Sequence, residues 1–373
     1  MPITAYSKTY QRELDVSQLE SLFDQSSLSA ELSFRDFVIT DIECPACNVT
    51  GGHVVNEGVS SSTGRKVSQK HFSFRSKLGR DTHLSFCDFY NGTDKLKVVA
   101  NEGSVDFRKS NSPVTKAIGL MSCIAIENGF FTQRNIRDMR QWFLELRNTG
   151  DFSFDINSHV INLARVSYIR TKRNSKSFVP DPIGAHDEKF NIDKEVYESL
   201  YHKLPQYNLA SCHRENSSYF DIRLQAVVKK AITIVKKDSK TVSFDREMLF
   251  DKYKLATRLS MAIIQNNDVL YNKLSASRGR VCNPLMAISS LLLFTSDWNY
   301  ELALEKVKKI SNIKTAKDLN AGNIIGLNPF VNYSAWIIIK KLNSIRNELN
   351  DNTDYDAEFN AEKARLKKLY NLS

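Results

Sequence analysis

The stretch Glu43-Cys44-Pro45-Ala46-Cys47-Asn48, followed by Gly51-Gly52, decides how the first third of the chain is expected to fold. Two cysteines separated by two residues can converge on one tetrahedral metal ion, because the tight turn brings both sulfurs to about 2.3 Å from zinc. A small module rich in strands has little hydrophobic core and commonly depends on such an ion for its stability. The sequence therefore predicts a metal-stapled module around this turn.

Two further ligands are expected from the residues that follow the turn. His83 and Cys87 are separated by three residues, which places both donors on one side of a helical turn. With Cys44 and Cys47 they make a Cys3His set, in which His71 competes for the fourth position. Four protein ligands leave no open position for a reacting water, so this set indicates a structural Zn²⁺. A deaminase-type zinc is disfavoured, because no His-x-Glu element precedes the cysteine pair.

The same region is partly similar to His-Asn-His endonucleases, over residues 70–72 and 82–95. The resemblance implies that His71 is the general base for water, that Asn91 helps to hold Mg²⁺ or Mn²⁺, and that the reaction is phosphodiester hydrolysis. Tyr90 stands where that family has its last zinc cysteine, and His83 stands where it has the middle Asn. A metal-dependent nuclease is therefore an alternative, and it competes with the structural zinc site for His83.

Strand and helix signals divide the chain into three consecutive parts. Residues 32–108 contain β-branched or aromatic runs, such as Leu32–Thr40 and Leu96–Val99, between Gly, Ser and Asn clusters, which is typical of strands and turns. From about residue 113 the apolar periodicity becomes helical. We therefore expect an α+β fold: a β-rich zinc-binding domain with an N-terminal helical arm at 1–112, a mixed basic region at 113–218 with short strands and loops at 150–218, and a helical C-terminal domain at 219–373.

Individual helices can be placed by their caps and apolar spacing. Between Gln133 and Arg147 apolar residues recur at steps of three and four, and Thr132 is placed as the N-cap. Its arginines fall largely on the other side, which predicts a guanidinium-rich face toward solvent: Arg134, Arg137, Arg140 and Arg147. Asn283-Pro284 predicts the start of an apolar helix that ends near Phe294 and forms the centre of the C-terminal core. Further amphipathic helices are expected at 296–310, 334–349 and 357–372.

The composition is that of an ordinary globular protein. Of 373 residues, 42% are hydrophobic and 25% are charged, which argues against disorder. No stretch approaches the roughly 18 uncharged apolar residues of a membrane span. Charged residues occur too early for a secretory signal, so a cytoplasmic location is expected. Motifs for nucleotide hydrolysis, dinucleotide binding and serine hydrolysis are missing from the sequence.

An excess of basic residues favours a polyanionic partner. The chain has 52 basic and 42 acidic residues and a net charge of +10. Residues 1–112 hold 13 basic and 14 acidic residues, so the excess lies beyond the cysteine region. Residues 165–178 concentrate cations with Tyr168 and Phe178, a combination suited to phosphate contact and base stacking, and lysines at 229–230 and 236–240 add to it.

The sequence therefore predicts a zinc-containing protein that binds DNA or RNA largely through phosphate contacts. The residues expected to make those contacts lie in the arginine-rich helix and in the basic stretch: Arg134, Arg137, Arg140, Arg165, Tyr168, Arg170, Lys172, Arg173 and Lys176. The zinc module is also a candidate for contact with a protein partner. A second alternative is a protein interaction scaffold whose positive charge only keeps it soluble.

Overall fold

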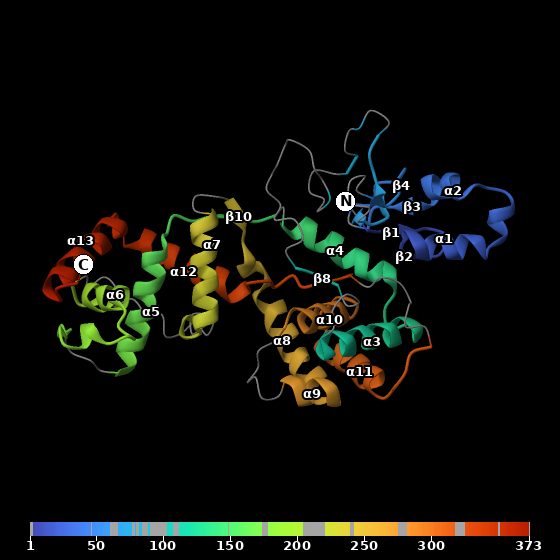
Figure 1. Ribbon diagram of the computed structural model, residues 1–373. Helices are drawn as coiled ribbons and strands as arrows, with labels where there is room; N and C mark the ends of the chain where they lie inside the picture. The colour runs from blue at the N-terminus through green and yellow to red at the C-terminus, as the bar shows by residue number, and fades with distance from the viewer. Residues whose placement is uncertain are drawn as a thin grey trace. The chain divides into compact units, whose positions relative to one another are not determined.

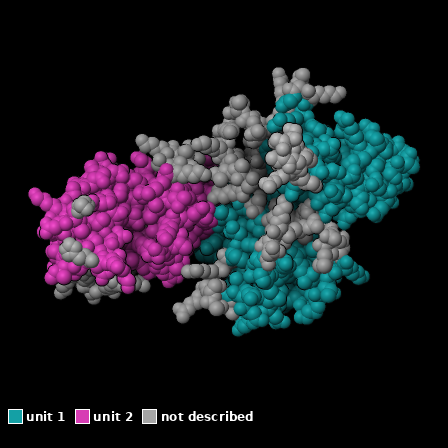
Figure 2. Space-filling view, viewed as in Figure 1, with its two compact units in different colours: residues 1–149, 249–331 teal, residues 150–248, 332–373 magenta. Residues whose placement is uncertain are grey.

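The computed structural model divides the chain into two compact units. Unit 1 comprises residues 1–149 and 249–331, and unit 2 comprises residues 150–248 and 332–373 (Figure 2). Each unit therefore joins two separate stretches of sequence, whereas the expected parts at 1–112, 113–218 and 219–373 are consecutive. The structure describes residues 3–45, 47–59, 66–76, 79, 82–83, 89, 103–106, 112–147, 149–173, 178–203, 221–238, 242–274, 282–317, 325–349 and 351–372.

Unit 1 contains both strands and helices. Its strands are short and belong mostly to the N-terminal part: β1 (Thr4–Ser7), β2 (Arg12–Asp15), β3 (Ile42–Glu43), β4 (His53–Val55), β5 (Gly58–Val59), β6 (Lys66–Ser68), β7 (His71–Ser73), β8 (Ser104–Asp106) and β11 (Ile325–Leu327). Its helices are α1 (Val16–Asp24), α2 (Phe34–Asp41), α3 (Pro113–Glu127), α4 (Gln133–Arg147), α8 (Phe250–Gln265), α9 (Asp268–Leu274), α10 (Asn283–Phe294) and α11 (Tyr300–Ser311).

Unit 2 is mainly helical. It contains α5 (Ser158–Arg173), α6 (Ile192–Lys203), α7 (Gln225–Asp238), α12 (Tyr333–Glu348), α13 (Tyr355–Leu369) and the antiparallel pair β9 (Asp151–Ser153) and β10 (Val242–Phe244). The chain as a whole is thus a mixed helix and strand protein with small sheets, which agrees with the α+β class in its coarse sense. None of the described helices is both long and apolar enough to cross a bilayer.

The N-terminal part of unit 1 is built on a three-stranded antiparallel sheet in the order β2-β1-β3. Directly after β2, Asp15 begins α1 with a capping box: its carboxylate accepts from the Gln18 amide at 2.9 Å, and the Gln18 side chain accepts from the Asp15 amide at 3.0 Å. Apolar side chains of α1, α2 and β7 form one core with Cys44 and Cys47. The two cysteines therefore lie inside a packed module.

The expected strand at Leu32–Thr40 is wrong, because residues 34–41 form helix α2. Ser33 caps this helix, accepting from the Asp36 amide at 3.2 Å, and the Asp36 carboxylate lies favourably in the first turn. Phe37 and Val38 are buried against the core. The cap and the core contact outweigh the strand preference of the β-branched residues. The other expected strand, Leu96–Val99, lies outside the described residues.

The expected helix Gln133–Arg147 is confirmed as α4. Its N-terminus is closed by Thr132, whose hydroxyl accepts from the Asn135 amide at 3.2 Å, and Ile136, Met139 and Phe143 are buried. The helix expected at Asn283-Pro284 is also confirmed as α10, which ends at Phe294 and has Cys282 at its cap.

The position expected for α10 in a C-terminal core is wrong. This helix, which is buried from Leu285 to Leu293, belongs to unit 1, where it packs against α8, α3 and α11 (Figure 1). Its apolar residues on every side explain this placement, because such a helix must be surrounded by other elements.

Residues 158–173 form helix α5, so the expectation of short strands and loops in this part of the chain is wrong. The Asn157 side chain begins α5 by accepting from the amides of His159 and Val160 at 3.0 and 3.3 Å. Val160, Ile161 and Ala164 face the core of unit 2. The part of the basic stretch from Arg165 to Arg173 therefore lies in the C-terminal turns of this helix.

Candidate metal centre

The Cys-x2-Cys stretch forms a closed turn at the end of β3. The Cys44 amide donates to the Val49 carbonyl at 2.8 Å, and the Asn48 amide donates to the Cys44 carbonyl at 3.1 Å. Asn48 adopts a left-handed conformation with φ of 62°, which asparagine tolerates better than most residues. Gly52 follows, and a Cβ there would lie 2.6 Å from side-chain atoms of Ile42 and Phe74. The backbone and the core beneath it therefore fix the direction of both cysteines.

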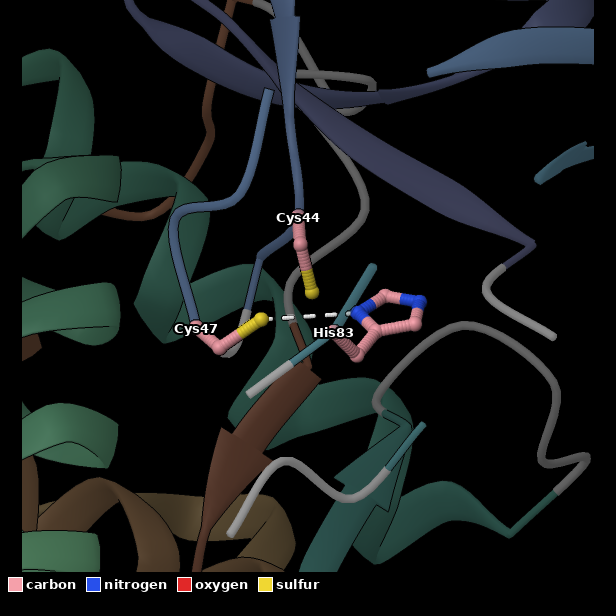
Figure 3. A group of neighbouring side chains, drawn as sticks. All are labelled: Cys44, Cys47 and His83. Carbon is pink, nitrogen blue, oxygen red and sulfur yellow. Dashed lines mark hydrogen bonds between the residues drawn. The ribbon is translucent and has the colours of Figure 1, made fainter. Parts of the chain in front are cut away.

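Cys44, Cys47 and His83 come together from two distant segments (Figure 3). Their ligand atoms lie within 4.8 Å of one another, and all three residues are buried. The Cys47 Sγ lies 3.4 Å from the His83 Nδ1. Two ligands bound at about 2.3 Å and 2.0 to 2.1 Å to one tetrahedral ion lie roughly 3.5 Å apart. The group could therefore hold a metal ion, with Nδ1 as the imidazole ligand.

Aromatic and backbone contacts hold His83 beside the cysteines. Its ring packs between Phe74 and Phe89, with centroid distances of 5.3 and 5.9 Å. The preceding residue, Thr82, donates from its amide to the Phe74 carbonyl at 3.1 Å, which ties this segment to the end of β7. The imidazole is thus positioned by its own neighbours, as is usual for a ligand in a stable site.

Of the predicted ligands that the structure describes, Cys44, Cys47 and His83 are brought together and His71 is not. Cys87 lies outside the described residues. His71 lies on β7, where its Nδ1 is 2.9 Å from the Gln69 carbonyl oxygen, and it is not a member of the buried group. Asn91, which the nuclease alternative requires beside His71, also lies outside the described residues.

Arg137 of α4 contacts both ends of the cysteine turn. Its guanidinium pairs with Glu43, which precedes Cys44, and its Nε donates to the Asn48 Oδ1 at 2.6 Å. The guanidinium also lies over the Tyr6 ring, 4.3 Å from the centroid. Burial raises the pKa of Tyr6, while Arg137 acts in the opposite direction. The Arg137 side chain is only 11% exposed. Its contacts with Glu43 and Asn48 therefore stabilise the cysteine turn.

Arg140 makes a second contact with the same module. Its Nη1 lies 3.1 Å from a carboxylate oxygen of Glu13 and 3.5 Å from the Pro45 carbonyl within the turn. The two side chains are only 12% and 5% exposed. The expectation of an outward guanidinium face is therefore wrong for Arg137 and Arg140, because acidic and carbonyl groups of the N-terminal module face them. Arg134, one turn earlier, is exposed as expected.

The structure describes only some of the side chains at 165–178 that are expected to contact nucleic acid. Arg165 is half-buried on α5, and Tyr168 packs against the core of unit 2, so its ring is not displayed as a free stacking surface. Arg170, Lys172 and Arg173 belong to the last turns of α5, but their side chains are outside the description, as is the whole of Lys176.

Helix α7 carries a basic face. The sequence-based prediction gave its lysines only as an addition to the basic stretch at 165–178. Val228, Ala231, Ile234 and Val235 are buried, while the opposite side of the helix is exposed and basic: Lys229, Lys230 and Lys236, with Arg223 just before the helix. Among the described residues, none forms an ion pair with these four cations. Lysines at steps of one, six and seven in an otherwise apolar helix were the signal that could have identified this face.

Comparisons with known proteins add no assignment, since no family model, no curated protein and no solved structure matches this chain.

Proposed function

We propose that the chain binds nucleic acid through its phosphates and that a structural zinc organises its N-terminal module. Cys44, Cys47 and His83 supply the soft sulfur and imidazole ligands that suit zinc. Cys87 is proposed as the fourth ligand, because it follows His83 by only four residues and a closed set excludes catalytic water. Burial of the three described ligands supports a structural role, since a substrate has no direct access to them.

The observation that carries the nucleic-acid proposal is the exposed basic face of α7. Arg223, Lys229, Lys230 and Lys236 are exposed, and no described acidic group within ion-pair distance neutralises them. Cations that are free of intramolecular partners can replace the counterions of a phosphate backbone, which is the main source of sequence-independent affinity. The arginines of α4 support this choice by contrast, because Arg137 and Arg140 already have carboxylate partners.

A binding titration over a salt series tests the proposal. Fluorescently labelled single-stranded and duplex DNA and RNA of equal length are titrated with the zinc-loaded protein at salt concentrations from about 50 to about 300 mM. Phosphate contacts weaken steeply over this range of salt. We expect micromolar or tighter binding at low salt, with a steep fall as salt rises. Absence of binding to all four nucleic acids at the lowest salt rejects the proposal and favours the scaffold alternative.

The same samples test the nuclease alternative. Added Mg²⁺ or Mn²⁺ is expected to leave the nucleic acid intact, because His83 is engaged with Cys47 in the proposed zinc site. Metal-dependent cleavage that disappears in His71→Ala, with zinc content unchanged, would establish the nuclease in place of a binding protein.

A further inference from the structure

An aromatic hollow in unit 1 shares no lining residue with the metal centre or with the basic face of α7. It has a volume of about 520 Å³ and lies where α4 meets the connection between α10 and α11. Its walls are formed mainly by four rings that are only partly buried: Phe130, Trp142, Phe294 and Trp298. The Trp142 ring lies 5.8 Å from Phe294 and 5.4 Å from Trp298, tilted by 43° and 48°. Trp142, Phe294 and Trp298 therefore form one contiguous aromatic group at this hollow.

The backbone that presents Trp298 to this hollow is strained. Asp297 and Trp298 are consecutive non-glycine residues with φ of 51° and 59°, in the left-handed region that costs an L-residue about 1 to 2 kcal/mol. Hydrogen bonds hold this conformation, since the Trp298 amide donates to the Leu293 carbonyl at 2.8 Å and the Asp297 amide donates to the Phe294 carbonyl at 3.2 Å. A bulky residue in this region is unusual, and such strain concentrates at ligand sites.

Charge around the hollow selects among aromatic-binding ligands. The Lys252 ammonium lies 5.3 Å from the Trp298 ring centroid, and the Lys306 ammonium donates to the Thr295 carbonyl at 2.7 Å. Asp297 is the single acid among the lining residues that the structure describes. The Lys252 charge would repel a cationic ligand, such as a methylated lysine, from the Trp298 ring. The same charge attracts the phosphate of a nucleotide whose base stacks on the rings.

Polar groups at the hollow also suit a base edge. The Asn135 Oδ1 accepts from the Thr132 amide and hydroxyl at 2.8 and 3.0 Å, which fixes the amide and leaves Nδ2 as a donor without a described partner. Asp297, which also lines the hollow, offers carboxylate acceptors. A nucleobase presents both donors and acceptors on its edge and a π-face for stacking.

We propose that the hollow lined by Trp142 and Trp298 binds an unpaired nucleobase of single-stranded nucleic acid. This inference rests on the proposed function and deepens it: the lysines of α7 contact phosphate in any nucleic acid, and the aromatic hollow adds affinity for strands whose bases are free to stack. Each stacked base contributes about 1 to 3 kcal/mol when removed by substitution, which corresponds to roughly 5- to 150-fold in affinity.

Tryptophan fluorescence is a direct readout, because Trp142 and Trp298 line the hollow while the third tryptophan, Trp336, is buried in unit 2. The full-length zinc-loaded protein is titrated with an unlabelled single-stranded oligonucleotide, with a duplex of equal length and with a trimethyllysine peptide. We expect saturable quenching by the single strand only, and single-strand binding at least 5-fold tighter than duplex binding. Trp142→Leu should remove this preference and most of the quenching, whereas Trp142→Phe retains part of the preference and Trp336→Phe retains both.

The outcomes separate this inference from the function on which it rests. If single strand and duplex bind equally without quenching, the hollow is not a base site, but the phosphate-binding function stands. If neither binds at low salt, the proposed function fails and this inference fails with it. Quenching by the trimethyllysine peptide and not by oligonucleotides would overturn the base assignment in favour of a cation cage. Should Trp142→Leu fail to fold, the quenching and the strand preference of the unmodified protein decide the question.

Discussion

Helices α4 and α7 have similar cation content but use it differently. Arg137 and Arg140 of α4 face Glu43 and Glu13 and are about nine-tenths buried, so their charges stabilise the attachment of the cysteine turn to the helix. Lys229 and Lys230 of α7 are exposed and have no described acidic partner. The difference teaches that the number of cations on a helix does not locate an interface; the groups that face those cations do.

The chemistry of the two side chains fits this division. Arginine presents a planar fork that can join two acceptors at once, which Arg137 does with Glu43 and Asn48. Lysine is a flexible point charge that stays hydrated, and it contacts phosphates without a fixed geometry. Arginines therefore connect the N-terminal module to the helical part of unit 1, while the lysines of α7 are exposed.

Removal of the metal is the strongest way to break the comparison. Cys44→Ser or treatment with a chelator should unfold the N-terminal module, because a structural zinc supplies several kcal/mol or more of its folding free energy. Hydrogen exchange should then increase over residues 3–59, including the partners of Arg137 and Arg140, while unit 2 keeps its protection. Metal analysis should find one zinc per chain in the unmodified protein and in the control Cys282→Ser, which lies outside the cluster. Retention of protection after metal loss would contradict the assigned role.

The next largest effect is expected at Arg140. Arg140→Ala leaves the buried Glu13 carboxylate without its cation, which should lower the free energy of unfolding by about 3 kcal/mol. Arg134→Ala is the matched control on the same helix, since Arg134 is exposed and the expected change is within about 0.5 kcal/mol. Denaturant melts of the two variants measure the difference. Equal effects would mean that Arg140 does not stabilise the module.

A moderate effect on binding, without one on stability, is expected for α7. Lys229→Gln with Lys230→Gln should weaken nucleic-acid binding by about tenfold and lower the salt slope by about 2, because each phosphate contact contributes about 0.9. The control is Lys308→Gln with Lys309→Gln on α11, an exposed pair that removes the same charge. If both double variants bind equally weakly, only net charge matters and the basic face is not a site.

The smallest change in stability is expected at Glu362 of α13, whose carboxylate is paired with cations of unit 2 as Glu13 and Glu43 are paired with arginines of α4. The Ser199, Lys203 and Arg365 side chains bind the Glu362 carboxylate and lower its pKa from 4.5 to about 2, despite its burial. Because the folded pKa is lower than the unfolded one, the stabilisation is complete above about pH 4.5 and is lost as the pH falls toward 2.

The magnitude is on the order of 1 to 2 kcal/mol, since Lys203 and Arg365 are each about half exposed and solvent screens them. Glu362→Gln should flatten the stability of unit 2 between pH 4.5 and 2, while Glu358→Gln, an exposed position of the same helix, should leave the pH dependence unchanged. Thermal melts across this range make the measurement. An unchanged slope in Glu362→Gln would show that this carboxylate is not what makes unit 2 acid-sensitive.

Elements whose ends and faces are set by nearby residues could be predicted from the sequence. The N-cap at Thr132 and the apolar spacing that follows give α4 its observed bounds, and Asn283-Pro284 marks the start of α10. Residues 34–41 show where this fails, because strand-forming side chains there are overruled by the Ser33 cap and by burial of Phe37 and Val38. The pairing of β9 with β10 depends on segments far apart in sequence, so the division into two units had no local signal.

The candidate metal centre divides in the same way. The spacing of Cys44 and Cys47 predicted two ligands, and the spacing of His83 to Cys87 predicted His83 as a third, with His71 as its competitor. The structure places His83 and not His71 in the buried group. The contacts of Arg137 and Arg140 could not be predicted, because amphipathic spacing shows which side of a helix is polar and does not show what faces it.

The different roles of the α4 arginines and the α7 lysines are tested most directly by measuring the salt slope of binding and the free energy of unfolding together, for one variant of each helix. We expect opposite patterns from the two variants. Lys229→Gln with Lys230→Gln should lower the slope by about 2 and leave the free energy of unfolding within about 0.5 kcal/mol. Arg140→Ala, studied where it remains folded, should lose about 3 kcal/mol and keep its slope. A lower slope in Arg140→Ala with an unchanged slope in the α7 variant would contradict the account.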